Sequence, residues 1–139
     1  RFIGDTTKFP QRLQELISET WDLCRDRQGM VLNIAMNYGG RAEITRAVRA
    51  IAEKVAEGRL DPADIDESMV ANHLYTAGQP DPDLILRPSG EQRLSNFLLW
   101  QSAYAELLSM EVLWPDFTEQ DLDRALVEFA HRNRRFGGV

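Results

Sequence analysis

Short apolar runs that alternate with amphipathic stretches constrain the fold of this chain most strongly. Residues 31–36 (Val-Leu-Asn-Ile-Ala-Met) and 84–86 (Leu-Ile-Leu) are short and apolar, as strands inside a parallel sheet are. Residues 41–57, between them, carry apolar residues at three- and four-residue steps, which is typical of an amphipathic helix. Because strands and helices alternate, the sequence predicts an α/β fold: a parallel sheet flanked by helices.

The first predicted helix, residues 11–27, carries an apolar stripe on one face. Its members recur at three- and four-residue steps: Leu13, Leu16, Ile17, Thr20 and Cys24. Pro10 suits the start of this helix. Because Cys24 falls on the stripe, we expect its thiol to be buried. A single cysteine cannot form an internal disulfide, which fits the reducing conditions of the cytoplasm.

The later part of the chain is predicted to hold two further helices and a strand. Residues 96–106 are expected to be helical, and residues 107–113 to form an apolar strand. Thr118, with Asp121 three residues later, resembles a capping box at the start of the last helix. The apolar stripe of this helix is predicted to consist of Leu122, Leu126 and Phe129.

The charge of the chain restricts its possible ligands. The formal net charge is −6, so broad electrostatic attraction to nucleic acid or to anionic lipid is not expected. Any binding of phosphate must therefore depend on a local cluster of cations. No stretch approaches the ~20 apolar residues that a membrane-spanning helix needs.

Such a cluster follows the strand at 84–86. Arg87 and Arg93 lie in a loop with Ser89, Gly90, Glu91 and Ser95. Ligands bind at the carboxyl ends of strands in open α/β sheets, and arginine grips phosphate oxygens through its planar fork. One interpretation is a phosphate or diphosphate site. The other is that both arginines pair with Glu91 and with other surface carboxylates.

A pair of glycines marks the turn between the run at 31–36 and the following helix. The motif Asn-Tyr-Gly-Gly-Arg at 37–41 has two interpretations. The glycines could expose backbone N–H groups to an anion at the helix N-terminus. They could instead form a tight turn that needs positive φ angles, which is the interpretation we favour.

Three motifs occur in order and at close spacing: Arg-Pro-Ser-Gly-Glu-Gln-Arg-Leu-Ser-Asn-Phe at 87–97, Trp-Gln-x-x-Tyr-x-Glu at 100–106, and Trp-Pro-Asp-Phe at 114–117. Together they resemble the signature of the cis-prenyltransferases, the family of undecaprenyl diphosphate synthase. The motif at 37–41 and the terminal Arg-Arg-Phe-Gly-Gly at 134–138 are also similar to family motifs. One departure is Pro88, which stands where the family usually has threonine.

The resemblance implies a function and roles for individual residues. The family condenses isopentenyl diphosphate with an allylic prenyl diphosphate, elongating a cis-prenyl chain to a polyprenyl (undecaprenyl) diphosphate with the help of Mg²⁺. By resemblance, the isopentenyl diphosphate would be bound by Arg87, Arg93, the Leu94 backbone and Ser95, with Glu91 and Gln92 in support. Glu106 would bind the metal, and the tail residues Arg135 and Gly137 would reach into a neighbouring subunit, which implies a homodimer.

The family's Met-Asp-Gly-Asn-Gly-x-Arg-Trp and Phe-Ser-x-Glu-Asn motifs do not occur in these 139 residues. Residues 1–139 are therefore expected to be the C-terminal portion of a single cis-prenyltransferase domain whose N-terminal half is missing. The expected catalytic aspartate and asparagine would lie in that half, so this portion alone would be inactive. The full protein is expected in the cytoplasm, with peripheral contact at the inner face of the membrane because the product is a lipid.

Two other functions fit the same residues. The chain could be a non-catalytic partner subunit of a cis-prenyltransferase, although the full arginine loop argues against this. It could also be an α/β module that binds another phosphorylated metabolite, since a fold alone does not fix a function.

Overall fold

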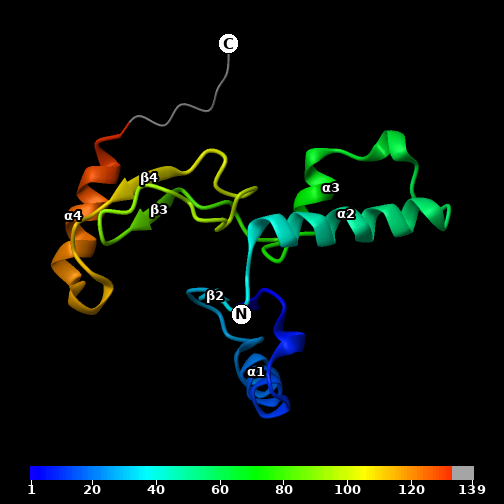
Figure 1. Ribbon diagram of the computed structural model, residues 1–139, viewed down its shortest axis with the longest axis horizontal. Helices are drawn as coiled ribbons and strands as arrows, with labels where there is room; N and C mark the ends of the chain where they lie inside the picture. The colour runs from blue at the N-terminus through cyan, green and yellow to red at the C-terminus, as the bar shows by residue number, and fades with distance from the viewer. Residues whose placement is uncertain (133–139) are drawn as a thin grey trace. The chain divides into compact units, whose positions relative to one another are not determined.

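The computed structural model describes residues 1–132, which belong to two compact units (Figure 1). The first unit comprises residues 1–78, and the second begins at Gln79. Each unit contains one pair of parallel strands together with helices. The predicted α/β class, with parallel strands flanked by helices, is confirmed. Within the described residues the strands form two separate pairs.

The first unit contains two strands and three α-helices, besides two short 3-10 helices: β1 (Phe2–Ile3), α1 (Gln11–Cys24), β2 (Ile34–Ala35), α2 (Gly40–Ala56) and α3 (Glu67–Ala71). Strand β2 is shorter than the predicted run at 31–36, because β1 offers only two residues for pairing. In the parallel ladder Phe2 is level with Ile34, and Ile3 is level with Ala35.

The core of the first unit lies along α2, beside which α3 packs (Figure 1). Ala47 and Ile51 on α2 are buried, as is Leu74 after α3. Glu43, in the first turn of α2, is only 1% exposed. Its carboxylate accepts hydrogen bonds from the Tyr38 hydroxyl at 2.5 Å and from the Tyr75 backbone N–H at 2.6 Å. These bonds tie the start of α2 to the segment after α3.

Helix α1 differs from the prediction in its burial. None of its residues is buried, and Leu16, Thr20 and Cys24 on the predicted stripe are exposed. The expectation of a buried Cys24 thiol is therefore wrong. The physical reason is the size of the neighbouring sheet, since a two-stranded pair offers too small a surface to cover the stripe of a 14-residue helix.

The turn at 37–41 also differs from the prediction. The left-handed residue is Asn37, with φ of 47°, whereas Gly39 is extended and caps α2. The Asn37 amide donates to the Asp5 carbonyl at 2.9 Å. Gly4 lies across from this turn, where a Cβ would come within 2.1 Å of the Met36 carbonyl oxygen. The close approach of Gly4 to the Met36 carbonyl, rather than a glycine turn, therefore joins the carboxyl ends of β1 and β2.

The second unit is built on β3 (Leu84–Arg87) and β4 (Glu106–Ser109), which lie side by side, and on α4 (Glu119–Ala130) (Figure 1). Its buried apolar side chains are Ile85 on β3, Leu108 on β4 and Ala125 on α4. The predicted strand at 107–113 is present but shorter, because β3 offers only four partners.

The predicted helix at 96–106 is wrong. This segment forms a series of turns, and Ser95, Asn96 and Leu98 have φ angles of 50°, 65° and 46°. A right-handed helix needs φ near −60°, so a left-handed residue at each of these positions prevents it from starting. Apolar periodicity alone could not reveal this backbone conformation.

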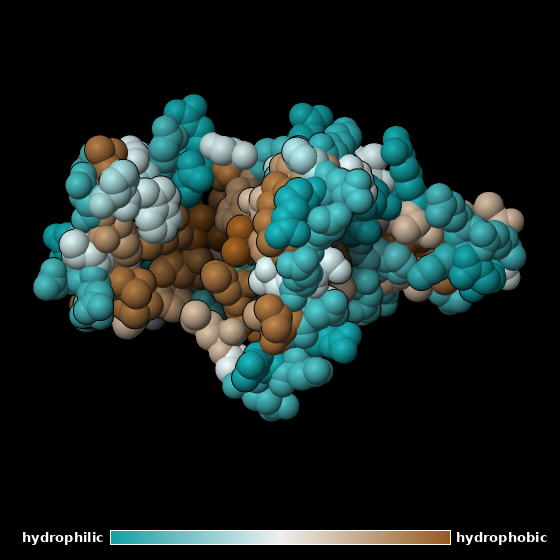
Figure 2. Space-filling model, turned by 90° about the horizontal axis from the view of Figure 1, so that it is seen from below, coloured by the Kyte–Doolittle hydropathy of each residue, from teal (hydrophilic) through white to brown (hydrophobic). Residues whose placement is uncertain are grey.

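Helix α4 begins as predicted, with a capping box between Thr118 and Asp121. Its buried face differs, because Asp121 and Ala125 are buried while Leu122 and Leu126 are exposed. Apolar side chains are exposed on both units, and brown areas mark such residues on the face shown in Figure 2. Among residues 1–132, no helix combines the length and the apolar character needed to cross a bilayer.

Candidate functional site: the arginine loop

The arginine loop, residues 87–98, starts at the carboxyl end of β3, as the sequence predicts. Arg87 is the last residue of this strand, and its carbonyl accepts a hydrogen bond from the Met110 N–H at 2.9 Å. The Ser89 and Gly90 N–H groups donate to the Val112 and Met110 carbonyls, each at 2.9 Å. The start of the loop is thereby fixed against the segment that follows β4.

Left-handed backbone conformations shape the rest of this loop. Besides Ser95, Asn96 and Leu98, the left-handed residues of the loop are Ser89 and Gly90, with φ angles of 68° and 66°. Only glycine adopts such angles without steric cost. At Gly90 a Cβ would also lie 3.1 Å from Oε2 of Glu111. Strained backbone of this kind concentrates at functional sites, where the surrounding structure holds it in place.

Arg87 has an unusual hydrogen-bonding state. Its side chain is half-buried, and its Nε atom is buried without a hydrogen-bond partner among the described residues. A buried N–H donor normally finds an acceptor, because leaving it unpaired costs about 1–3 kcal/mol. The site therefore favours an anionic ligand that brings oxygen atoms to this guanidinium. The alternative of ion pairing does not account for the Nε atom.

Arg93 is placed differently, because it pairs with Glu91 within the same loop. Its Nε donates to one carboxylate oxygen at 2.6 Å and its Nη2 to the other at 3.3 Å. The hydrogen bond from Arg93 lowers the pKa of Glu91, helped by the positive charges of Arg93 and Arg87. The pKa of Arg93 is raised by the same hydrogen bond. For Arg93, the contacts agree with the interpretation as a surface ion pair.

The remaining residues of the predicted substrate site lie near these arginines in the chain. Leu94 is half-buried and Ser95 is exposed. Arg135 and Gly137, predicted to contact the same diphosphate, lie outside the described residues.

Glu106, the predicted metal ligand, lies at the other end of the strand pair. It is level with Leu84 in the parallel ladder, whereas Arg87 is level with Ser109. Three steps of ~3.3 Å separate Glu106 from Arg87 by about 10 Å along the strands. The structure thus brings Arg87 and Arg93 into one loop, and it places Glu106 away from them.

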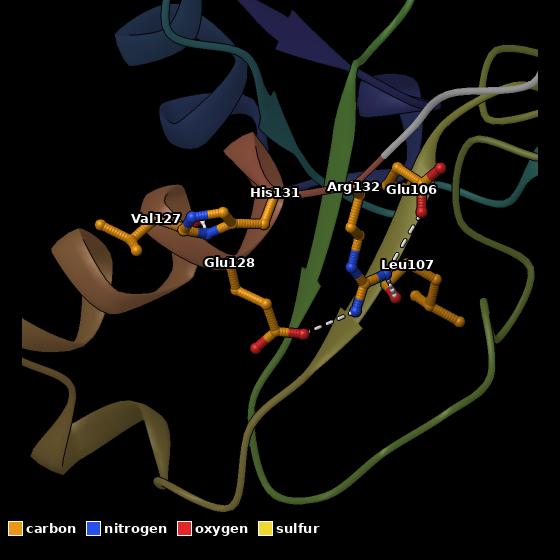
Figure 3. Close-up of polar contacts among 6 residues, drawn as sticks. All are labelled: Glu106, Leu107, Val127, Glu128, His131 and Arg132. Carbon is orange, nitrogen blue, oxygen red and sulfur yellow. Dashed lines mark hydrogen bonds and ion pairs between the residues drawn. The ribbon is translucent and has the colours of Figure 1, made fainter.

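A divalent metal is implied by the family resemblance, and Glu106 has suitable chemistry for it. Its side chain is 27% exposed, and Oε2 accepts a hydrogen bond from Arg132 at 3.2 Å (Figure 3). Mg²⁺ is usually bound by one or two carboxylates together with substrate phosphates and water, so a single carboxylate fits. In the described part of the chain, no three His, Cys, Asp or Glu side chains form a metal-binding group.

Arg132 is the residue of this region that the sequence missed. Its position suggested only a cation at the end of a helix, yet its guanidinium reaches β4. Its two partners there, Glu106 and Leu107, lie 26 and 25 residues earlier in the chain. No short-range pattern could have indicated these contacts.

The chain matches known proteins over nearly its whole length. Residues 1–137 match the family model described as "Putative undecaprenyl diphosphate synthase". The isoprenyl transferase of Clostridium perfringens (strain 13 / Type A) is 49% identical over 137 residues, which are 99% of this chain and 54% of that protein. The ditrans,polycis-undecaprenyl-diphosphate synthase of Escherichia coli (strain K12) is 54% identical over 139 residues, covering all of this chain and 55% of that protein.

A solved structure agrees with these matches. The crystal structure of lavandulyl diphosphate synthase from Lavandula x intermedia, in complex with dimethylallyl diphosphate, is 45% identical and superimposes with a TM-score of 0.95. The alignment covers 99% of this chain and 59% of that one. The chain thus spans about half the length of the relatives that it matches. On its fold and its matched sequence, the chain belongs to the prenyltransferase family of undecaprenyl diphosphate synthase.

Proposed function

We propose that the chain is the part of a cis-prenyl chain-elongating enzyme that binds isopentenyl diphosphate. The whole enzyme would condense isopentenyl diphosphate with an allylic prenyl diphosphate and release a polyprenyl, here undecaprenyl, diphosphate. The observation that carries this proposal is the buried, unpartnered Nε of Arg87 at the carboxyl end of β3. The names of the relatives support the reaction class.

Arg87 and Arg93 would bind the diphosphate in different ways. Arg87 is ready to donate, because none of the described residues accepts from its Nε. Arg93 must first exchange the Glu91 carboxylate for a phosphate oxygen. The pair with Glu91 is solvent-exposed, with side chains 76% and 38% accessible, and such exposed pairs contribute little to stability. A diphosphate, which carries more negative charge than one carboxylate, can therefore displace Glu91.

The groups next to Arg93 would complete the site. The backbone N–H of Leu94 and the hydroxyl of Ser95 are further donors for phosphate oxygens. The left-handed conformations of Ser95 and Asn96 turn the chain directly after Leu94. Such a turn gathers successive donors around one anion, as backbone anion sites commonly do.

In the proposed reaction, diphosphate leaves the allylic substrate, a carbon–carbon bond forms to isopentenyl diphosphate, and a proton is lost. Bound Mg²⁺ would supply charge neutralisation for diphosphate oxygens. The residues of this chain would hold and orient isopentenyl diphosphate. None of them is assigned to the bond-forming or proton-removing step, so we expect residues 1–139 to show no prenyl transfer alone.

A homodimer accounts for the separation of Glu106 from the arginine loop. In one chain these groups lie at opposite ends of the strand pair. If the site is shared, Glu106 and the tail residues Arg135 and Gly137 of one subunit could serve the arginine loop of the other. This arrangement needs no rearrangement of β3 and β4.

Calorimetric titration of the chain with isopentenyl diphosphate and, separately, with inorganic pyrophosphate tests this function. Arg87→Gln should weaken binding of isopentenyl diphosphate roughly ten- to hundredfold, because a charged hydrogen-bond donor is lost. Arg12→Gln is the matched control, since Arg12 pairs with the exposed carboxylates of Glu15 and Glu19 on α1, and it should change binding by no more than about twofold. Unchanged binding by Arg87→Gln contradicts the site. Equal affinity for both ligands favours a module for other phosphorylated metabolites.

A further inference from the structure

One guanidinium connects the end of α4 with the start of β4. Arg132 Nη1 donates to the Leu107 carbonyl at 2.9 Å and to Oε2 of Glu106 at 3.2 Å, and Nη2 donates to Glu128 at 2.7 Å (Figure 3). The pKa of Arg132 is raised, first by the bond to Glu128 and then by the bond to Glu106. Arg132 is thus a stable cation that three oxygen atoms hold in one place.

The pair of Arg132 with Glu106 is more sheltered than the pair of Arg93 with Glu91. Its side chains are 31% and 27% exposed, compared with 76% and 38% for Arg93 and Glu91. Solvent therefore screens it less, and the two N–H groups of Nη1 can serve Glu106 and Leu107 together. Among the described residues, Glu106 Oε1 accepts no hydrogen bond.

An ordinary helix-end cation would not need this geometry. Near the end of α4, the Val127 carbonyl has its own partner, because His131 Nδ1 lies 2.8 Å from it (Figure 3). Arg132 instead faces a different element, β4. Its guanidinium thus lies against the Glu106 carboxylate.

We propose that Arg132 is a positioning residue for Glu106. It holds Oε2 in place and leaves Oε1 to bind the divalent cation of the bound diphosphate. This proposal rests on the proposed function, because it assumes that Glu106 is a metal ligand. Carboxylates that bind metals are themselves usually hydrogen-bonded, and removing such a partner typically costs about 10–100-fold in metal affinity.

The test is the affinity of the chain for Mg²⁺, measured by calorimetry with isopentenyl diphosphate at saturation. Arg132→Gln should weaken Mg²⁺ binding by about tenfold or more. Arg124→Gln is the matched control, because it makes the same substitution on α4 at an arginine that pairs with Asp121. We expect the Mg²⁺ affinity of this control to equal that of the unmodified chain. Arg132→Lys keeps the positive charge but loses the planar guanidinium. Its Mg²⁺ affinity should fall between those of Arg132→Gln and the unmodified chain.

A double-mutant cycle separates positioning from a general structural effect. If Arg132 acts through Glu106, then Arg132→Gln should cause no further loss of Mg²⁺ affinity in a Glu106→Gln chain. Additive losses, an Arg132→Gln affinity equal to that of the unmodified chain, or an equal loss in Arg124→Gln would each overturn the proposal. Melting curves accompany each variant. If Arg132→Gln does not melt cooperatively, the same comparison is made with Arg132→Lys, and an unchanged Mg²⁺ affinity then overturns the proposal.

The outcomes distinguish the inference from the function on which it rests. If the unmodified chain binds isopentenyl diphosphate but Arg132→Gln leaves the Mg²⁺ affinity unchanged, only the inference fails. If the unmodified chain binds no isopentenyl diphosphate with or without Mg²⁺, the proposed function fails and the inference is overturned with it.

Discussion

At the scale of single residues, the backbone of the arginine loop is held in conformations that most residues avoid. Ser89, Ser95, Asn96 and Leu98 are left-handed although none of them is glycine. Each such residue costs of order 1–2 kcal/mol, so the contacts around the loop must outweigh this cost. The loop is thus shaped in advance, and a ligand that binds it need not order it.

Gly90→Ala tests this shape. Alanine at a φ of 66° is strained, and its Cβ would meet the Glu111 carboxylate at 3.1 Å. We expect a loss of unfolding free energy of about 1–2 kcal/mol and a parallel loss of affinity for isopentenyl diphosphate. Gly29→Ala is the control, because nothing lies within 4 Å of a Cβ there. Equal free energies of unfolding for Gly90→Ala and Gly29→Ala, measured by denaturant unfolding, would contradict the prediction.

At the scale of elements, helix α4 carries a capping box at its start. The Thr118 hydroxyl lies 2.6 Å from Asp121, and the Thr118 N–H donates to the same carboxylate at 2.8 Å. Arg124 forms an ion pair with Asp121 from the next turn. These bonds anchor the start of the helix that Arg132 follows.

Thr118→Ala should destabilise the chain by about 1 kcal/mol, because the cap is lost. The effect should depend on pH. Hydrogen bonds from Thr118 lower the pKa of Asp121, so the stabilisation is present above the ordinary carboxyl pKa of about 4 and is lost as the pH falls through the lowered value. Thr20→Ala, in the middle of α1, is the control and should be nearly neutral. Thermal unfolding at several pH values checks this, and an unaltered acid profile in Thr118→Ala would count against it.

The sequence predicted the elements better than their surroundings. Helices α1, α2 and α4 and the strand before Arg87 follow from local periodicity and capping residues, which short stretches contain. The exposure of Cys24 and of Leu126 does not follow from local periodicity, because it depends on which distant surface covers a helix. The false helix at 96–106 reflects backbone angles that side-chain patterns do not encode.

The site was predictable only in part, for the same reason. The arginines of the loop are adjacent in sequence and follow a recognisable strand, so their proximity could be predicted. The distance between Arg87 and Glu106 depends on the register of β3 and β4, and the reach of Arg132 depends on how α4 packs on β4. Both are contacts between distant parts of the chain.

At the scale of the whole molecule, each unit contributes a small parallel strand pair, and the arginine loop belongs entirely to the second unit. Binding of the diphosphate to this loop can therefore be examined in residues 1–139. Prenyl transfer requires more groups than this loop contains. Binding of the diphosphate, with Arg87 as the main contact, is therefore the property to test in this chain.

The most direct test is an NMR titration of the isotopically labelled chain with isopentenyl diphosphate, following the Nε–Hε signals of the arginines. The account predicts that the Arg87 and Arg93 signals shift together and saturate, since both guanidiniums take up phosphate oxygens. The signals of Arg12 and Arg25, which pair with exposed acids on and just after α1, should stay in place. An Arg87 signal that does not move while other arginines respond would contradict the account.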